Sequence, residues 1–222
     1  MKRRAMLAFG LAALAVTTSA VAKAPSTWDG LVEVKSKRFQ LVYLQPGADF
    51  RSYSKVMIDP TEVAFEKNWM REHNSGLRGG GRITERDMQQ AISEAVVAAG
   101  EIFASAWTKG GYTVVTAPGP DVLRVRTGVM DVRVNAPDKM QAGRTYGFAP
   151  EAGSAVLFVE ARDSMTGALL GRAVDKRFAG DSGPARRTRI SNRGDFRDLV
   201  EEWASAGVRG MDELKTLSPI RQ

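Results

Sequence analysis

The chain has 222 residues, 43% of them hydrophobic, with a single histidine and no cysteine, which excludes disulfides, thiol catalysis and thiolate metal sites. The formal charge of +7 falls to about +4 without the basic residues at positions 2–4, because 29 basic residues then face 25 acidic ones. Arginines and acids alternate along the chain instead of forming a basic face interleaved with aromatics, so we predict no nucleic-acid partner.

The first 22 residues have the three parts of a secretory signal peptide. Residues 1–4 are basic, an apolar stretch runs from Ala5 to about Val16, and small residues follow. The apolar stretch is about a dozen residues long, whereas a membrane anchor needs about 20. We therefore predict cleavage after Ala22 or Ala24 and export to the periplasm. The mature protein is expected to have no lipid anchor and no membrane-spanning segment.

The next part of the chain predicts an arm, two strands and a loop. Residues 23–37 are mostly polar and read as a leading arm. Strands are predicted at 39–44 and 55–65, where Pro60 fits an edge position or a bulge because it cannot donate to the ladder. A mobile loop is predicted near 71–83, where glycines cluster. Their spacing matches neither the P-loop nor the dinucleotide fingerprint, so we predict no phosphate site.

The clearest element is a helix over residues 84–109. Thr84 and Asp87 resemble a capping box at its start. Apolar residues then recur at spacings of three and four, which places them in one stripe along the helix. Gly110 and Gly111 end the pattern as a C-terminal cap would. The apolar stripe indicates that this helix covers a sheet.

The second half is predicted to be mostly strands, with one more helix. Gly128 indicates a bulge within the longest strand, and residues 163–167 (DSMTG) are typical of a hairpin turn. Mobile loops are predicted near 135–153 and 179–194, and a final helix begins near Asp195. The predicted strands span 112–116, 122–134, 155–162 and 169–178.

This order of elements predicts a single domain over residues 38–217. The helix at 84–109 links strands that could be parallel, whereas the later hairpins are antiparallel. The expected fold class is α+β, with one mixed, mostly antiparallel sheet and two long helices packed on one face.

The sequence resembles a bacterial family of envelope lipoproteins of unassigned function, the domain of unknown function 3313. The likeness covers about residues 50–212. The resemblance implies an envelope protein, although this chain lacks the cysteine that would carry the lipid. The residues that carry the likeness are YSKVMIDP (53–60), PGPDVLRVR (118–126), VEARDSMTG (159–167), VDKR (174–177) and WA (203–204).

More loosely, the order of elements looks like that of several small envelope accessory domains. Examples are the curli-assembly lipoprotein, the outer-membrane activators of penicillin-binding proteins and the N-terminal domain of TolB, which work by contacting other proteins. This likeness is an analogy of fold, and fold does not determine function.

Candidate catalytic groups are few. His73, the only histidine, lies in the predicted loop at 71–83, so it is expected to be a surface residue. A Ser-His-Asp triad or a histidine-rich metal site would have to run through this one side chain. We therefore predict no histidine-dependent active site, no metal site and no cofactor.

Four carboxylates remain as alternatives. Glu160, Asp163 and Asp175 lie close together in the predicted hairpin, and Asp131 lies on a strand that could be its neighbour. Two acids about 5 to 9 Å apart could hydrolyse a glycoside, and a cluster of acids could bind a hard cation. A structural role is favoured, because Asp163 suits the turn. Basic residues available to pair with the other acids are Arg162, Arg172, Lys176 and Arg177.

A partner surface is the preferred functional prediction. Trp69, Trp107 and Trp203 follow helical patterns and are expected in the core. Trp28 and Tyr146 lie in segments that look exposed, so they are candidates for partner contact. Basic residues that could join them are Arg186, Arg187 and Arg189.

The sequence thus predicts a non-enzymatic, exported envelope protein that acts by contact with another envelope protein. One alternative is a periplasmic hydrolase that uses carboxylates on an envelope polymer; facing acids without arginine partners would favour it. The other is a binding module for a small anionic ligand, which an enclosed cavity beside arginines would favour. A shallow surface with an exposed apolar patch would favour the partner model.

Overall fold

The computed structural model describes residues 24–75, 82–135, 148–149, 151–180, 185–186 and 189–221. Its helices are α1 (Trp69–Ser75), α2 (Glu85–Lys109) and α3 (Arg189–Leu217). No helix within these ranges combines the length and the apolar character needed to span a bilayer. The strands of the main sheet are β1 (Thr27–Trp28), β2 (Leu31–Val34), β3 (Leu41–Leu44), β4 (Lys55–Ile58), β5 (Glu62–Phe65), β6 (Thr113–Val114), β7 (Val122–Val134), β9 (Gly153–Asp163) and β10 (Leu169–Ala179); β8 (Phe148–Ala149) and β11 (Ala185–Arg186) pair separately.

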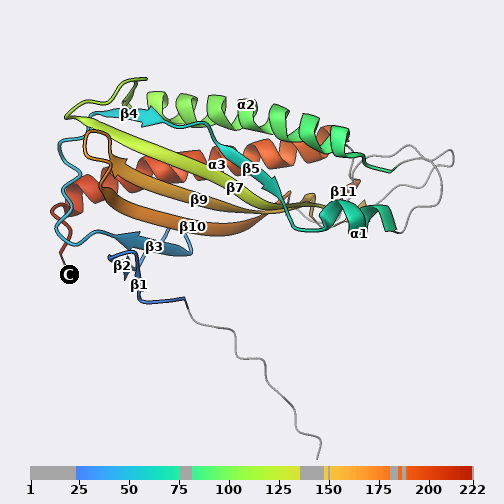
Figure 1. Ribbon diagram of the computed structural model, residues 1–222, viewed down its shortest axis with the longest axis horizontal. Coiled ribbons are helices and arrows are strands. Elements are labelled where there is room, and N and C mark those ends of the chain that lie inside the picture. Colours follow the sequence, from blue (N-terminus) through green and yellow to red (C-terminus); the bar gives the residue numbers. More distant parts are fainter. Residues whose placement is uncertain are drawn as a thin grey trace, which may run out of the picture.

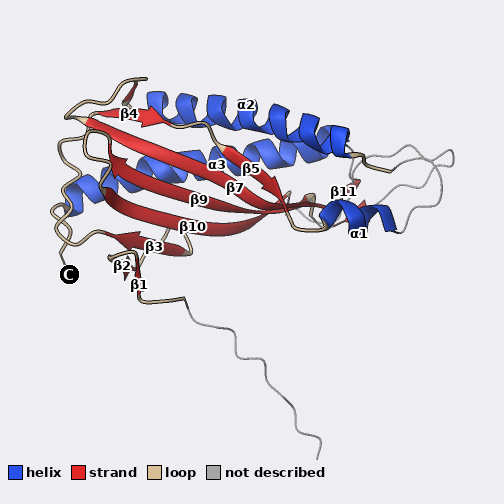
Figure 2. Cartoon of the chain, in the orientation of Figure 1, coloured by secondary structure: helices blue, strands red, loops and turns tan. Residues whose placement is uncertain are grey.

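The main sheet is mixed and is covered by two long helices. Its strand order is β1-β2-β3-β10-β9-β7-β4-β6, with β5 also paired to β7 (Figure 1). Strands β4 and β5 run parallel to β7, and β6 runs parallel to β4, whereas the other pairs are antiparallel. Helices α2 and α3 lie side by side and pack on the sheet (Figure 2). The α+β class with one mixed sheet is therefore confirmed.

The core lies between these helices and the sheet. One cluster joins Phe103 of α2 and Trp203 of α3 to Leu157 of β9. A second cluster surrounds Trp107 at the other end of α2. Together with Trp69 of α1, the three tryptophans expected in the core are all buried.

Helix α2 begins and ends as its sequence predicts. The Thr84 hydroxyl accepts a hydrogen bond from the Asp87 backbone N–H at 3.2 Å, and the Asp87 carboxylate accepts from the Thr84 N–H at 2.8 Å. The shorter side chain of aspartate is therefore sufficient to complete a capping box. Gly110 caps the other end, donating to the Ala106 carbonyl at 3.0 Å.

Several elements differ from the prediction. The segment predicted as a leading arm contains β1 and β2, which form a hairpin that extends the sheet next to β3. Residues 55–65 form two strands, β4 and β5, with Pro60 in the break between them. The irregularity in β7 lies between Met130 and Arg133, where Asp131 has a φ of 50°, and not at Gly128.

The predicted mobile loops also contain regular structure. Helix α1 occupies residues 69–75, because Trp69 anchors it by stacking on Phe65 and donating to the Val134 carbonyl at 3.1 Å. Helix α3 begins at Arg189, six residues before the predicted Asp195. The remaining parts of the predicted loops, 76–81, 136–147, 150, 181–184 and 187–188, lie outside the described residues.

Candidate binding pocket

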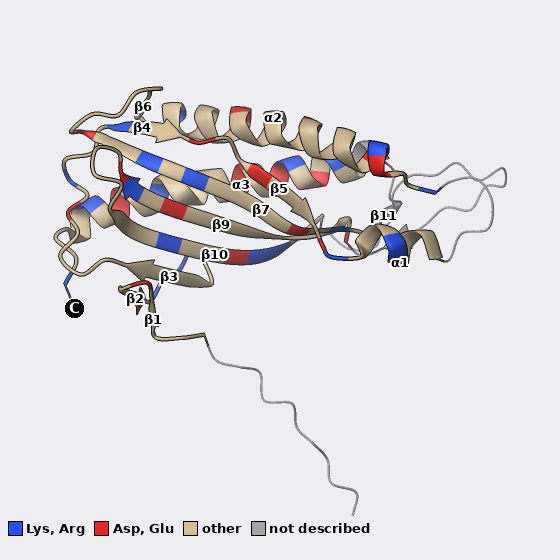
Figure 3. Ribbon diagram, in the orientation of Figure 1, with Lys and Arg blue, Asp and Glu red and all other residues tan. Residues whose placement is uncertain are grey.

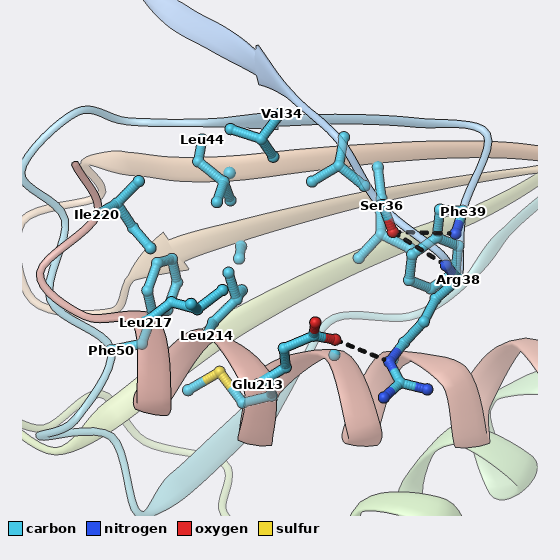
Figure 4. A pocket seen from close by; sticks show the side chains of 18 of the residues that line it. Val34, Ser36, Arg38, Phe39, Leu44, Phe50, Glu213, Leu214, Leu217 and Ile220 are labelled. Atoms are coloured by element: carbon cyan, nitrogen blue, oxygen red, sulfur yellow. Dashed lines mark hydrogen bonds and ion pairs between the residues drawn. The ribbon is translucent and has the colours of Figure 1, made fainter. Parts of the chain in front are cut away.

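A pocket of about 590 Å³ lies between the C-terminal half of α3 and the sheet. Its floor is formed by apolar side chains of β7 and β9, including Leu123, Val125 and Val159. Met211 and Leu214 line it from α3, and Figure 4 shows Leu214 on this helix. A volume of this size lies within the range of about 300–1,000 Å³ that is typical of small-molecule sites.

Glycines create this space, because they leave gaps where α3 crosses the sheet. Near the N-terminal half of α3, Leu199 and Trp203 fill the interface with the sheet. Further along, Gly207 and Gly210 line the pocket. A Cβ added at Gly207 would meet no atom within 4 Å, and one at Gly210 would have its nearest neighbours at 3.9 Å. The pocket begins where large inward side chains give way to glycine.

The segment after α3 forms one wall of the pocket. The Ile220 N–H donates to the Ala48 carbonyl, and the Gly47 N–H donates to the Ile220 carbonyl, both at 2.9 Å. The Ser218 hydroxyl accepts from the Phe50 N–H at 2.9 Å. Phe50 and Ile220 are buried and line the pocket. These three bonds hold the wall against the 47–50 turn.

Charged side chains lie at the opposite end of the pocket. The Nε of Arg38 lies 3.2 Å from a carboxylate oxygen of Glu213 on α3 (Figure 4). The turn that carries Arg38 is fixed, because the Ser36 hydroxyl accepts from the backbone N–H groups of Arg38 and Phe39 at 3.1 and 3.3 Å. Lys35, next to Ser36 in the chain, also lines the pocket, and Arg221 lines it from the segment after α3. This set of charges gives the pocket a basic rim.

The carboxylate of Glu160 is buried beneath arginines on the other face of the sheet. Glu160 is only 3% exposed and accepts from Arg172 at 2.8 Å and from Arg162 at 3.1 Å. In Figure 3, basic and acidic positions lie next to each other on β7, β9 and β10. Burial raises the pKa of Glu160, but the hydrogen bonds and charges of the two arginines outweigh it, so the pKa is lowered. Arg162 and Arg172, which the sequence offered as partners for the acids, thus both bind Glu160.

Asp175 links the sheet to α3. Its carboxylate accepts from the Trp203 indole at 2.9 Å, from the Gln40 N–H at 2.9 Å and from Arg177 at 2.6 Å. These three donors come from a helix and two different strand regions. The Asp175 carboxylate therefore joins α3 to the sheet.

Asp163 holds the hairpin turn between β9 and β10. One carboxylate oxygen accepts from the Met165 N–H, the Thr166 N–H and the Thr166 hydroxyl, at 3.1, 2.7 and 2.8 Å. The other oxygen accepts from the Tyr53 hydroxyl at 2.9 Å. The turn's hydrogen bonds lower the pKa of Asp163, and burial with this carboxylate raises the pKa of Tyr53. Asp131 is exposed in the β7 irregularity.

We expect acid to destabilise the fold through Glu160 and Asp163. Each has a folded-state pKa below its usual value of about 4, so its contribution is present above that pH and is lost as the pH falls through the folded-state pKa. Urea titrations from pH 7 to pH 3 should show stability falling below about pH 4. The Asp163→Asn variant should lose less stability over this range than the wild type. Equal acid sensitivity of the two proteins would contradict the role of Asp163.

Of the candidate partner residues, Trp28 is the one whose surroundings the structure describes. Trp28 is half-buried, with Tyr43 and Phe158 at centroid distances of 5.7 and 6.0 Å and the Arg172 guanidinium 4.6 Å from its ring. Trp28 therefore packs on the sheet with part of its surface left exposed. Arg186 lies in β11, and Arg189 is the first residue of α3. Tyr146 and Arg187 lie outside the described residues.

His73 lies on α1 and not in a loop. Its ring stacks on Trp69 with a centroid distance of 5.5 Å and an interplanar angle of 18°. Within the described residues no group of three or more histidines and carboxylates is arranged to hold a metal ion. The stacking indicates that His73 contributes to the packing of this short helix.

The apolar pocket was missed by reasoning from the sequence. Gly207 and Gly210 both lie within α3. Their spacing of three places them near one another on the same side of an α-helix. Two glycines on the inner side of a helix that covers a sheet are the signal that could have indicated a gap in the core.

Comparisons with known proteins identify the family and give distant matches among solved structures. No curated protein sequence gives a significant match. Among solved structures, the PelC dodecamer from Paraburkholderia phytofirmans is 13% identical, with 74% of this chain and 95% of that chain covered and a TM-score of 0.38. A Xanthomonas campestris protein described with the family DUF330 is 8% identical, with coverages of 78% and 91% and a TM-score of 0.40. No functional argument rests on likenesses of this strength.

The family assignment rests on the sequence itself. The resemblance predicted over about residues 50–212 is confirmed and extends further toward the N-terminus. A family model described as "Protein of unknown function (DUF3313)" matches residues 21–206, and the chain therefore belongs to this family.

Proposed function

We propose that the protein is an exported, non-enzymatic binding protein of the cell envelope, and that its site is the pocket between α3 and the sheet. The observation that carries this proposal is an apolar pocket of about 590 Å³ whose wall and rim are both held by hydrogen bonds. Export rests on the signal-like residues 1–22. This function corresponds to the alternative of a binding module for a small anionic ligand. The apolar pocket adds an apolar portion to that ligand.

The physical basis is the desolvation of an apolar ligand. Each methylene group that moves from water into such a pocket contributes about 0.8 kcal/mol. The walls supply this environment through Leu123, Val125 and Val159 of the sheet and Leu214 of α3. Rim charges then orient the ligand, as a few polar groups do in most small-molecule sites.

Two observations favour this proposal over the other readings. Glu160 and Asp175 are each paired with arginine, which disfavours a hydrolase that relies on them. The large exposed apolar side chains of the described residues are scattered over different elements, as Val97, Met165 and Phe178 illustrate. Scattered residues of this kind are normal on protein surfaces and do not indicate a docking patch.

The Gly207→Leu variant tests the site directly. The new side chain should occupy the pocket and weaken the binding of the neutral fluorescent dye N-phenyl-1-naphthylamine by about tenfold or more. It should not destabilise the fold, because leucine is favoured over glycine in a helix by about 0.7 kcal/mol and a Cβ at this position meets no atom within 4 Å. Dye fluorescence and urea unfolding provide the two measurements.

Gly100→Leu is the matched control for this experiment. Gly100 lies within α2, away from the pocket, and a Cβ there also meets no atom within 4 Å. This variant should bind the dye as the wild type does. Unchanged dye affinity in Gly207→Leu, or the same loss in both variants, would contradict the proposed site.

A further inference from the structure

We propose that the ligand is a single-chain amphiphile with an anionic headgroup, whose chain lies among the apolar side chains and whose headgroup binds Arg38 in place of Glu213. This inference rests on the proposed function and specifies its ligand.

The two ends of the pocket differ in polarity. Phe50, Leu217 and Ile220 lie at one end of the view in Figure 4, and Arg38 lies at the other. Leu217 is 59% exposed although it lines the pocket. A ligand with an apolar chain at one end and a charge at the other matches this arrangement and would cover the exposed leucine.

The backbone that carries Arg38 is anchored, whereas its side-chain ion pair is open to water. The Arg38 carbonyl accepts from Arg177 at 2.9 Å, and its N–H donates to Ser36. The side chains of Arg38 and Glu213 are 32% and 53% exposed. Ion pairs this exposed are held weakly because water and salt compete for both partners. An incoming anion can therefore replace the Glu213 carboxylate at little cost.

The remaining charges at the rim select the sign of the headgroup. Lys35 and Arg38 line the pocket from the turn that follows β2, and Glu213 is the acidic member of the lining, whereas Arg221 lines it from the segment after α3, next to Ile220. Arg172 also lines the pocket, but its guanidinium is bound to Glu160 and Asp29. The end of the pocket that holds Arg38 is thus positive by one charge before a ligand binds, from Lys35 and Arg38 against Glu213. An anionic headgroup is attracted to it, and a cationic one is repelled.

The size of the pocket favours one chain over a lipid surface. A volume of about 590 Å³ suits a single small ligand. The far wall is fixed by the bonds from Gly47, Phe50 and Ile220. Leu123, Val125 and Phe50 within the pocket are buried, so an extracted chain can reach them more readily than a flat bilayer can.

Three ligands of equal chain length test the inference by displacement of N-phenyl-1-naphthylamine from the purified protein. Dodecanoate, dodecanol and dodecyltrimethylammonium should be compared at pH 7.5, below their micelle concentrations. Dodecanoate should bind about fivefold more tightly than dodecanol, and the cation should bind most weakly. Half-molar salt should reduce this preference, because it screens exposed charges.

Two rim variants assign the preference to residues. Arg38→Gln should bring the affinity for dodecanoate close to that of the same variant for dodecanol. Glu213→Gln should strengthen dodecanoate binding, because the competing carboxylate is removed. Arg197→Gln is the matched control, since Arg197 forms a comparable exposed pair with Glu201 on α3 at 2.9 Å. It should leave the preference intact.

The outcomes separate the two proposals. Displacement by all three ligands with equal affinity would overturn the anionic-headgroup inference and leave the binding function standing. Failure of all three ligands and of the dye to bind would overturn both. Flotation with phosphatidylglycerol vesicles, without displacement of the dye by dodecanoate, would show a membrane surface as the target and would also overturn the inference.

Discussion

Replacing Trp203 by alanine should lower the free energy of unfolding by about 4 kcal/mol. Trp203 has no exposed surface and lies in the core cluster formed by the two long helices and the sheet. Its indole N–H donates to the buried Asp175 carboxylate at 2.9 Å. The substitution would remove a large apolar side chain and leave a cavity, and it would also withdraw a hydrogen bond from a buried charge. Urea unfolding followed by circular dichroism measures the loss.

Two further variants divide this effect into packing and hydrogen bonding. Trp203→Phe keeps most of the apolar volume but lacks the donor, so it should cost about 2 kcal/mol. Trp28→Ala removes a half-buried tryptophan at the edge of the sheet and should cost clearly less than Trp203→Ala. If the two alanine variants were equally destabilised, Trp203 would not hold the central position assigned to it.

The second large effect is expected at Glu160, where alanine should cost about 3 kcal/mol. The side chain of Arg172 is only 10% exposed, so loss of the Glu160 carboxylate would leave a guanidinium largely out of water. Its other carboxylate partner, Asp29, is 62% exposed and cannot replace the lost contact. Chemical denaturation at neutral pH gives the size of the effect.

The control for Glu160 is an exposed carboxylate on a neighbouring pair of strands. Glu62 forms an ion pair with Arg126, and both side chains are about half exposed. Glu62→Ala should cost less than about 1 kcal/mol. The double variant Glu160→Met/Arg172→Met should be more stable than Glu160→Ala, because the buried guanidinium is removed together with its buried partner. If Glu160→Ala lowered the free energy of unfolding as little as Glu62→Ala does, burial would not increase the contribution of the Glu160–Arg172 pair to stability.

Elements defined by local signals could be predicted from the sequence. The Thr84–Asp87 capping box marks the start of α2, and β7 begins and ends where its alternating pattern does. Asp163 and Gly167 are typical of the turn that the structure shows, with Gly167 at a φ of 73°. Each of these signals acts over a few residues, so no knowledge of the tertiary fold is needed to read it.

Features that depend on distant contacts could not be predicted. Helix α1 is short and is held by Trp69 through contacts with β5 and the end of β7. The hairpin of β1 and β2 is stabilised by pairing with β3, a contact between segments that the local sequence pattern does not indicate. The pocket depends on which side of α3 faces the sheet. Gly207 and Gly210 become informative only when that orientation is known.

The wall of the pocket also has a consequence for folding. The bond from Phe50 to Ser218 joins residues that are 168 positions apart. Contacts between such distant segments form late, because the entropy of closing a long loop opposes them until most of the chain is ordered. The two helices and the central strands can therefore assemble before this wall is in place. Competence to bind a ligand would then arise at the end of folding, so incompletely folded molecules would not sequester it.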